Sequence, residues 1–448
     1  MAKLTVITLL TLAILFVSLQ AKDKLKLHIF LHSHMDEGWL YTFEGYYNGP
    51  GSADGGCVRC IFDNVYGSLL KNEQRKYQIA EVAFFKRWWR DQTETVKENY
   101  RRFLREGQVE FINGGWSATD EACSYYEDLI DNFIMGHRWL QDEFKLDPNV
   151  GWQIDSFGHS ATVAALMAQA GYDAFFFGRI DYQDWEKRRA DKNLEVIWRT
   201  ENPHNETLLG RVLYVHYSDT KFLVPDNYFC RSIFCHGRLD DGRYSRVADW
   251  VKEQSNAFRT NNIAMLVGDD FHLWQQAEKD FDGIEAMVDY YNKHPEFNIE
   301  AKFSTLSQYI SEMTQDYLAT NKNPLPSKHG DFFPYIENEW TSWVGYFTSK
   351  SMYKLKVRQI SQYYNAAKIL LAKYMLQVNK GEEIKLDGKA HRILNEALWS
   401  LEDPLAVVQH HDSISGTMRE NVKHDYEKML DTGRNNVDKV HFKEIFFI

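Results

Sequence analysis

The stretch KLKLHIFLHSHMDEGWL, residues 24–40, joins a strand pattern to a cluster of polar side chains. Its first seven residues alternate between polar and apolar side chains with a period of two, which is typical of a β-strand. The ten residues that follow contain two histidines, two acids, a glycine and a tryptophan. A strand that ends in so many reactive groups indicates that its carboxyl end faces a functional site.

Strand and helix patterns alternate along the first 340 residues. Further strand patterns lie at residues 76–85, 107–114, 149–155, 173–179, 211–217 and 262–271. Helical patterns lie between several of them, at residues 95–107, 124–144 and 161–171. Because strands that alternate with helices build parallel sheets, we predict the α/β class, either as a mostly parallel sheet or as an α/β barrel.

The pattern changes after about residue 340, where long helical segments replace the strands. We therefore predict an α/β domain at residues 22–340 and an α-helical bundle domain at residues 341–448. Residues 1–21 contain one lysine, a short apolar run and a small residue, Ala21. This pattern predicts a cleaved signal peptide, and no later stretch is apolar enough to anchor the chain in a membrane.

The composition limits the partners and the compartment. The net charge of -11 argues against a nucleic acid or an anionic membrane as partner. A sequon at Asn205 and five cysteines fit a secreted glycoprotein. Cys230 and Cys235 are candidates for a small disulfide loop. Cys57 and Cys60 form a C-x-x-C motif, which indicates zinc or redox chemistry only weakly because no second such motif is present.

Polar side chains follow four of the predicted strands. Asp36 follows the first strand, Asp155 and Arg179 end two others, and Asp269 and Asp270 end the strand at residues 262–271. In parallel α/β folds the carboxyl ends of the strands form the ligand crevice, so we expect these groups to converge. Each acid alone has another interpretation, and Asp269 in particular fits a helix N-cap.

Histidines beside these acids suggest a zinc site. His32, His34 and Asp36 are spaced by two, so they point to one side of an extended chain. Imidazole nitrogen and carboxylate oxygen are both zinc ligands, although strand-end histidines also occur as simple packing. The distant segment QHHDSISGT adds His410 and His411 at a predicted helix end. Adjacent helical residues are about 100° apart, so only one of these two should face the metal.

Two carboxylates at strand ends, one of them beside a metal, favour glycoside hydrolysis. Retaining hydrolysis uses one carboxylate as nucleophile and a second, protonated carboxyl group as acid. A hydrolase that activates a zinc-bound water, such as a glycan deacetylase, stays open as an alternative. A glycan-binding protein without activity is a third interpretation.

Seven segments resemble, in order, the signature blocks of glycoside hydrolase family 38, and most closely its lysosomal-type α-mannosidases. These segments are HSHMDEGW, EVAFFKRWW, INGGWSATDEA, GWQIDSFGHS, FFFGRIDYQD, VGDDF and VVQHHDSISGT. The resemblance implies a parallel β/α catalytic domain, seven-stranded and barrel-like, followed by the helical bundle. It also implies a zinc-dependent retaining α-mannosidase that removes mannose from glycoprotein N-glycans in the secretory pathway, either in the lysosome or after secretion.

The resemblance assigns roles to individual residues. It implies that Zn²⁺ is held by four side chains, which are His34, Asp36, Asp155 and His411. Asp155 is then also the nucleophile, and Asp270 is the general acid. Four further residues match positions that contact the sugar: Trp39, Phe157, Arg179 and Asp412.

Two features depart from the family pattern. Family members continue after the bundle into β-rich domains, so we expect either a separate β-domain partner or self-association through exposed apolar surface. After GDFFPY the chain reads IENEW, which places Glu337 where lysosomal enzymes carry an aspartate. With or without a β-domain partner, the expected substrate is a mannose-containing oligosaccharide.

Overall fold

The computed structural model describes residues 24–49, 56–200, 206–219, 234, 239–320, 324–379 and 388–444. The predicted signal peptide, the sequon at Asn205 and the proposed pair Cys230 and Cys235 lie outside these residues. Within the described part of the chain, no helix combines the length and the hydropathy needed to cross a membrane.

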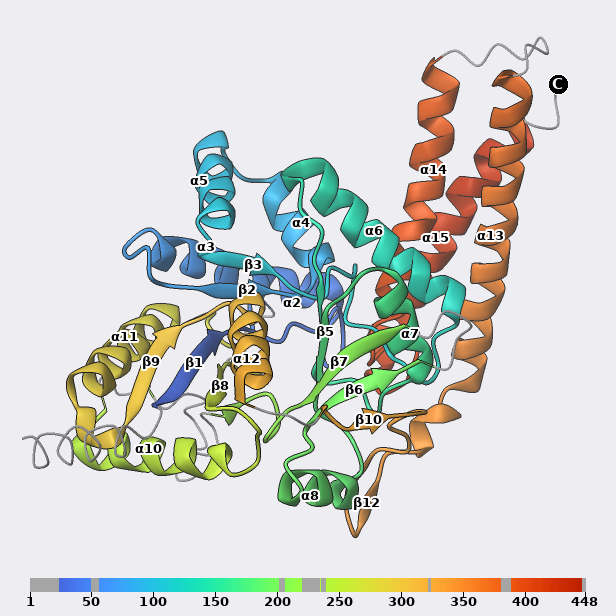
Figure 1. The fold of residues 1–448 in the computed structure, drawn as a ribbon. Coiled ribbons are helices and arrows are strands. Elements are labelled where there is room, and N and C mark those ends of the chain that lie inside the picture. Colours follow the sequence, from blue (N-terminus) through green and yellow to red (C-terminus); the bar gives the residue numbers. More distant parts are fainter. Residues whose placement is uncertain are drawn as a thin grey trace, which may run out of the picture.

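Mostly parallel strands form the centre of the α/β part, and the last of them ends at Ser342 (Figure 1). They are β1 Leu25–Leu31, β2 Tyr77–Ile79, β3 Val109–Phe111, β4 Val150–Gln153, β5 Ala174–Phe177, β6 Glu195–Arg199, β7 Thr207–Val212, β8 Asn262–Val267, β9 Ile299–Phe303, β10 Ser327–Lys328, β11 Ile336–Asn338 and β12 Thr341–Ser342. Only β6 beside β7 and the hairpin β11–β12 pair in the antiparallel direction among these strands. The predicted α/β class is therefore confirmed.

Hydrogen bonds divide the strands among four sheets, in the orders β8-β1-β9, β10-β6-β7-β5-β4, β2-β3 and β11-β12. The first two enclose a common buried cluster that includes Phe30 of β1, Trp152 of β4, Phe176 of β5 and Leu266 of β8. The predicted seven-stranded barrel is not confirmed, because the hydrogen bonds of the described residues do not form one continuous ring. The short strands β2 and β3 pair only with each other.

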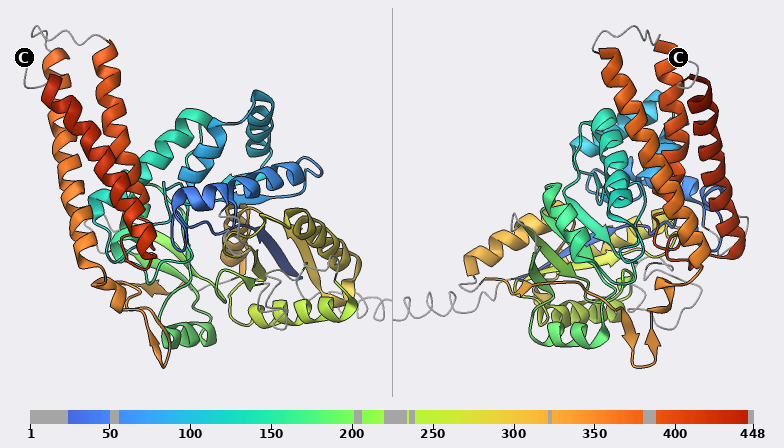
Figure 2. Two further views of the ribbon diagram at one scale, coloured as in Figure 1. Left: turned by 180° about the vertical axis from the view of Figure 1, so that it is seen from behind. Right: turned by 90° about the vertical axis from the view of Figure 1, so that its right-hand side faces the viewer.

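Helices surround the central strands in the views of Figure 1 and Figure 2, while the hairpin of β12 projects beyond them. They are α2 Phe43–Asn48, α3 Val58–Leu69, α4 Val82–Arg90, α5 Glu94–Arg105, α6 Tyr126–Phe144, α7 Ala161–Gln169, α8 Tyr182–Ala190, α10 Asp241–Ser255, α11 Ala277–Lys293 and α12 Leu306–Thr320. Tyr309 and Met313 of α12 join the cluster enclosed by the strands. The helices predicted at residues 95–107, 124–144 and 161–171 are confirmed as α5, α6 and α7.

Three long helices follow: α13 Ser351–Asn379, α14 Gly388–Val407 and α15 Glu420–Glu444. They lie side by side and extend beyond the α/β part of the molecule (Figure 2). The C-terminal end of α14 is bound to the loop before α6, where the Ser117 hydroxyl donates to the Ala406 carbonyl at 3.0 Å. The Asp120 N–H donates to the Gln409 carbonyl at 2.8 Å. These bonds hold the segment after α14 against the carboxyl edge of the strands.

Some of the predicted strand bounds are wrong. The strand expected at residues 76–85 ends at Ile79, and α4 begins at Val82 because helical spacing buries Phe84, Phe85 and Trp88 together in the core. The C-x-x-C motif, which indicated zinc or redox chemistry only weakly, forms a disulfide between Cys57 and Cys60 at the N-terminus of α3, so its thiols are not available to bind zinc.

Candidate active site and metal centre

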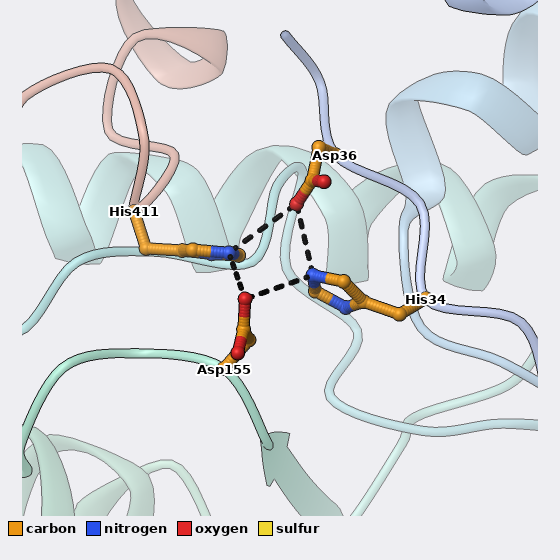
Figure 3. Close-up of side chains that lie close together, drawn as sticks. All are labelled: His34, Asp36, Asp155 and His411. Carbon is orange, nitrogen blue, oxygen red and sulfur yellow. Dashed lines mark ion pairs between the residues drawn. The ribbon is translucent and has the colours of Figure 1, made fainter. Parts of the chain in front are cut away.

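Four side chains from distant parts of the chain meet at the carboxyl edge of the strands (Figure 3). His34 and Asp36 follow β1, and Asp155 follows β4. His411 comes from the turns after α14, which the loop before α6 holds in place. These are the four residues for which a zinc-binding role was predicted.

The pairing of β1 with β8 continues past both strand ends and fixes the backbone of His34. The His34 N–H donates to the Asp269 carbonyl at 3.2 Å, and the Phe271 N–H donates to the His34 carbonyl at 2.7 Å. Asp270 therefore lies directly beside His34 in an isolated parallel bridge. Asp269 accepts a bond from the N–H of Asp270 and caps no helix, since turns follow it.

The four facing atoms have the spacing of a tetrahedral metal site. The Nε2 atom of His34 lies 2.8 Å from Asp36 Oδ1 and 3.6 Å from Asp155 Oδ2. The Nε2 atom of His411 lies 3.3 Å and 3.4 Å from the same two oxygens. Ligand atoms about 2.1 Å from a tetrahedral zinc ion are separated by roughly 3.4 Å. The residues present therefore fit zinc in both chemistry and spacing.

Unsatisfied polar atoms point to the same conclusion. His34 Nε2, Asp36 Oδ1 and His411 Nε2 are buried and make no hydrogen bond among the described residues. Such atoms are costly to bury unless a partner is present, and a cation bound by all of them supplies one. Burial lowers the pKa of His34, but the carboxylates of Asp36 and Asp155 raise it to about 10. Zinc therefore competes with protons at this nitrogen.

Asp155 directs its two carboxylate oxygens to different partners. Oδ2 faces the two histidines, whereas Oδ1 accepts a hydrogen bond of 2.6 Å from Nε of Arg179. Burial raises the pKa of Asp155, but the Arg179 guanidinium holds that pKa well below its usual range. Arg179 in turn donates to the Tyr335 hydroxyl at 3.2 Å. Asp155 is therefore ionised and oriented, as a nucleophile must be.

Asp270 has the opposite character. Burial raises the pKa of this carboxyl group to about 7, against the lowering effect of the positive charge on His34. The Tyr217 hydroxyl donates a hydrogen bond of 2.6 Å to Asp270 Oδ1. Sequence reasoning missed Tyr217 because the strand predicted at residues 211–217 in fact ends at Val212. The rule that polar groups after strand ends face the site would have selected Tyr217 had that boundary been known.

The other residues predicted to contact the sugar differ in their surroundings. The ring of Phe157 lies edge-on to the ring of His411 at 5.8 Å and packs against Trp343 at 4.8 Å. Asp412 accepts a hydrogen bond from the Thr417 hydroxyl. Phe157 thus lies beside His411 in space, and Asp412 follows His411 directly in the chain. Trp39 is half-buried, and its carbonyl accepts the N–H of Arg419 just before α15.

Two histidines behave differently from the sequence-based expectation. His32 does not join the group, because its Nε2 atom contacts the Tyr217 carbonyl at 2.9 Å and burial lowers its pKa to about 3. The expectation that only one of His410 and His411 faces the metal assumed that both lie on a helix. The helix α14 ends at Val407, so helical geometry does not turn the two side chains apart. The Nε2 atom of His410 therefore also lies near the Asp36 carboxylate, at 3.5 Å.

Comparison with known protein families agrees with this site. Residues 24–338 match the model of the glycosyl hydrolases family 38 N-terminal domain, and residues 341–446 match the alpha mannosidase middle domain. The chain therefore belongs to glycosyl hydrolase family 38, a family of α-mannosidases. This confirms the family that the seven sequence blocks suggested.

Individual relatives show how much of a family member the chain represents. A probable alpha-mannosidase of Arabidopsis thaliana is 37% identical over 428 residues, which cover 93% of this chain and 38% of that protein. The lysosomal alpha-mannosidase of Homo sapiens is 33% identical, with 92% of this chain and 40% of the human protein covered. The chain thus spans about 40% of the length of these relatives.

Solved structures share the fold. The crystal structure of an alpha-mannosidase from Enterococcus faecalis V583 matches with a TM-score of 0.63 at 18% identity. The match covers 93% of this chain and 42% of that one. At this level of identity the likeness extends to the fold alone.

Proposed function

We propose that this chain is the catalytic part of a zinc-dependent retaining α-mannosidase that removes α-linked mannose from glycoprotein N-glycans. The observation that carries the proposal is the convergence of His34, Asp36, Asp155 and His411, with ligand-like spacing, in a member of family 38. Lysosomal enzymes among the relatives support the secretory pathway, and the lysosome within it, as the compartment.

In this proposal zinc is held by His34, Asp36, Asp155 and His411. Bound there, the ion supplies Lewis-acid stabilisation of hydroxyl groups on the mannose ring. The remaining chemistry belongs to the side chains. Arg179 keeps Asp155 ionised and fixes the direction of its carboxylate, so little reorganisation is needed before the reaction.

The reaction proceeds in two displacements. The Asp155 carboxylate attacks C1 of mannose, the bond from C1 to the glycosidic oxygen breaks, and the Asp270 carboxyl group gives its proton to the departing oxygen. Water then attacks C1, the bond to Asp155 breaks, and Asp270 takes a proton from that water. The raised pKa of Asp270 suits the first of these tasks, since the group must arrive protonated.

Three groups border the position of the sugar. Phe157 offers an aromatic edge beside His411, and Asp412 offers a carboxylate to a ring hydroxyl. Trp39, half-buried after β1, supplies a further apolar face. Tyr217 bonds to Asp270 and directs its carboxyl group toward the leaving oxygen.

The proposal is tested with the purified chain and an aryl α-mannoside. Release of mannose that stops after treatment with a chelator and returns on addition of zinc is the expected result. Product analysis separates the alternatives, because a zinc-dependent deacetylase would release acetate from an acetylated glycan. Tight binding of mannose oligosaccharides with no release of sugar would instead identify a glycan-binding protein.

A further inference from the structure

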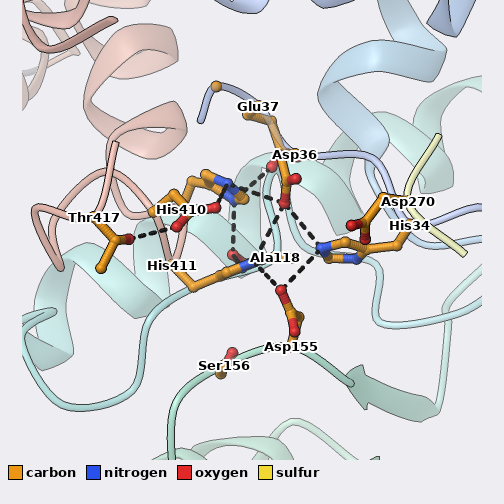
Figure 4. A network of polar contacts seen from close by, with 12 residues as sticks. His34, Asp36, Glu37, Ala118, Asp155, Ser156, Asp270, His410, His411 and Thr417 are labelled. Carbon is orange, nitrogen blue, oxygen red and sulfur yellow. Dashed lines mark hydrogen bonds and ion pairs between the residues drawn. The ribbon is translucent and has the colours of Figure 1, made fainter. Parts of the chain in front are cut away.

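One buried pair beside the four proposed ligands has no part in the mechanism above. Glu37 and His410 are both fully buried, and Glu37 Oε2 lies 2.9 Å from Nδ1 of His410 (Figure 4). Neither oxygen of Glu37 makes a hydrogen bond of ordinary geometry within the described residues. A buried carboxylate costs several kcal/mol unless a specific partner compensates it, and His410 is the partner within reach.

The Ala118 carbonyl explains what this pair does. It lies within hydrogen-bond distance of three donors: the His411 N–H at 3.0 Å, Nδ1 of His411 at 2.9 Å and Nδ1 of His410 at 3.2 Å. A carbonyl oxygen has two lone pairs, so three donors compete for two positions. The Glu37 carboxylate is an ion-pair partner of His410. Its Oε2 atom is closer to Nδ1 of His410 than the Ala118 carbonyl is, but only the contact with Ala118 has the geometry of a hydrogen bond.

The bond from His411 to Ala118 matters because His411 is a proposed ligand. A histidine that binds a metal through Nε2 is held in position by the acceptor of its Nδ1–H. The other edge of His410 faces the site as well, since its Nε2 atom lies 3.5 Å from Asp36 Oδ1 and 3.7 Å from Asp412 Oδ2. His410 therefore contacts a proposed ligand, Asp36, and a carboxylate proposed to bind the sugar, Asp412.

We propose that Glu37 and His410 are positioning residues of the metal centre. The Glu37 carboxylate holds the His410 ring by an ion pair at Nδ1, beside the Ala118 carbonyl that orients His411. The ring of His410 is thereby held with Nε2 between Asp36 and Asp412. This inference rests on the proposed zinc site and adds two residues to which neither the sequence blocks nor the mechanism gives a role.

The test compares zinc affinity, measured by competition with a chromophoric chelator, in the parent chain and in two variants of Glu37. Glu37→Leu removes the charged partner of His410 and should weaken zinc binding roughly 10–100-fold. Glu37→Gln keeps the shape of the side chain but removes its charge, and it should also bind zinc more weakly than the parent. The readout is metal binding, so it does not depend on turnover.

Glu121 provides a matched control. Its Oε1 atom lies 2.8 Å from Nδ1 of His159, and both side chains are fully buried, so it is a second buried Glu–His pair. Among the described residues, this pair forms no hydrogen bond or ion pair with the four proposed ligands. Glu121→Leu should lower the midpoint of thermal unfolding and leave zinc affinity unchanged. Equal loss of zinc affinity in Glu121→Leu and Glu37→Leu would overturn the inference, because the effect would then reflect general loss of packing.

The remaining outcomes separate this inference from the proposed function. A parent chain that binds no zinc would overturn the metal site and the positioning role together. A parent that binds zinc, with unchanged affinity in Glu37→Leu, would overturn the positioning role alone. If Glu37→Gln binds zinc as tightly as the parent, the negative charge of Glu37 does not matter, which also contradicts the proposal.

Discussion

Two carboxyl groups in one site have been given opposite properties by their neighbours. The pKa of Asp155 is held low by the Arg179 guanidinium, whereas burial raises that of Asp270 to about 7. Environments that separate two carboxyl groups in this way are how an enzyme obtains a nucleophile and an acid from the same residue type. The division of labour between Asp155 and Asp270 therefore follows from their contacts.

The acid role predicts a dependence on the leaving group. Asp270→Asn should slow hydrolysis of a mannoside with a poor leaving group by about 10²–10⁴-fold, because the departing oxygen must then leave without a proton. A mannoside with a very acidic phenol as leaving group needs less help and should lose much less. Steady-state kinetics on both substrates measure the difference, and an equal loss on both would exclude Asp270 as the acid.

The pKa of Asp270 predicts the basic side of the pH profile. The acid must be protonated, so kcat/KM should fall as the pH rises through the pKa of Asp270, which is about 7. Bound zinc adds positive charge nearby, so in the zinc-bound enzyme this fall should occur at lower pH. Tyr217→Phe removes a hydrogen bond that favours the ionised carboxyl group, so it should move this fall to higher pH. The residual activity of Asp270→Asn should not fall with pH in this way. If kcat/KM of that variant still falls through the same pH range, the titrating group is not Asp270.

At the level of the elements, close approach of the bundle helices depends on glycine. A Cβ atom at Gly433 of α15 would lie 2.3 Å from the Ser400 carbonyl oxygen of α14. Gly433→Ala should therefore push the two helices apart and lower the free energy of unfolding by about 1–3 kcal/mol.

Gly67 of α3 is the matched control for that change. A Cβ atom there would meet nothing within 4 Å, so Gly67→Ala should stabilise the chain by roughly 0.5–1 kcal/mol through its helix propensity. Denaturant unfolding measures both variants. Destabilisation of similar size at Gly67 would show that the effect at Gly433 is not one of helix contact.

Sequence patterns predicted the elements far better than their pairing. Polar groups after apolar runs identified Asp155 and Asp270, because burial makes a strand apolar until it reaches the site. Helical spacing in residues 76–85 was hidden by aromatic residues that are also common in strands, so α4 was missed. Pairing among strands such as β2 and β3 depends on contacts across the sheet, which no local pattern encodes.

The site itself was predicted at two levels. Spacing and strand ends supplied His34, Asp36 and Asp155, and the family resemblance supplied the choice of His411. Glu37 and Tyr217 were assigned no role, and His410 was set aside in favour of His411, because the importance of these residues arises from contacts with residues far away in the sequence. The Ala118 carbonyl could not be found from side-chain types at all.

At the scale of the whole molecule, the proposed zinc site joins the α/β part to the helical bundle. Three proposed ligands follow strands, and His411 follows α14. Since zinc at this site binds the folded state, its removal should lower the midpoint of thermal unfolding. His411→Ala leaves three ligands, so the midpoint of that variant should depend on zinc much less. An equal zinc dependence in parent and variant would place the ion elsewhere.

The zinc content of the purified chain tests the central claim most directly. Elemental analysis of the parent should find about one zinc ion per chain. His34→Ala should lose most of it. His32→Ala, which removes a buried histidine two residues away that lies outside the group, should keep it. Full zinc occupancy in His34→Ala, or a parent chain without zinc, would contradict the account.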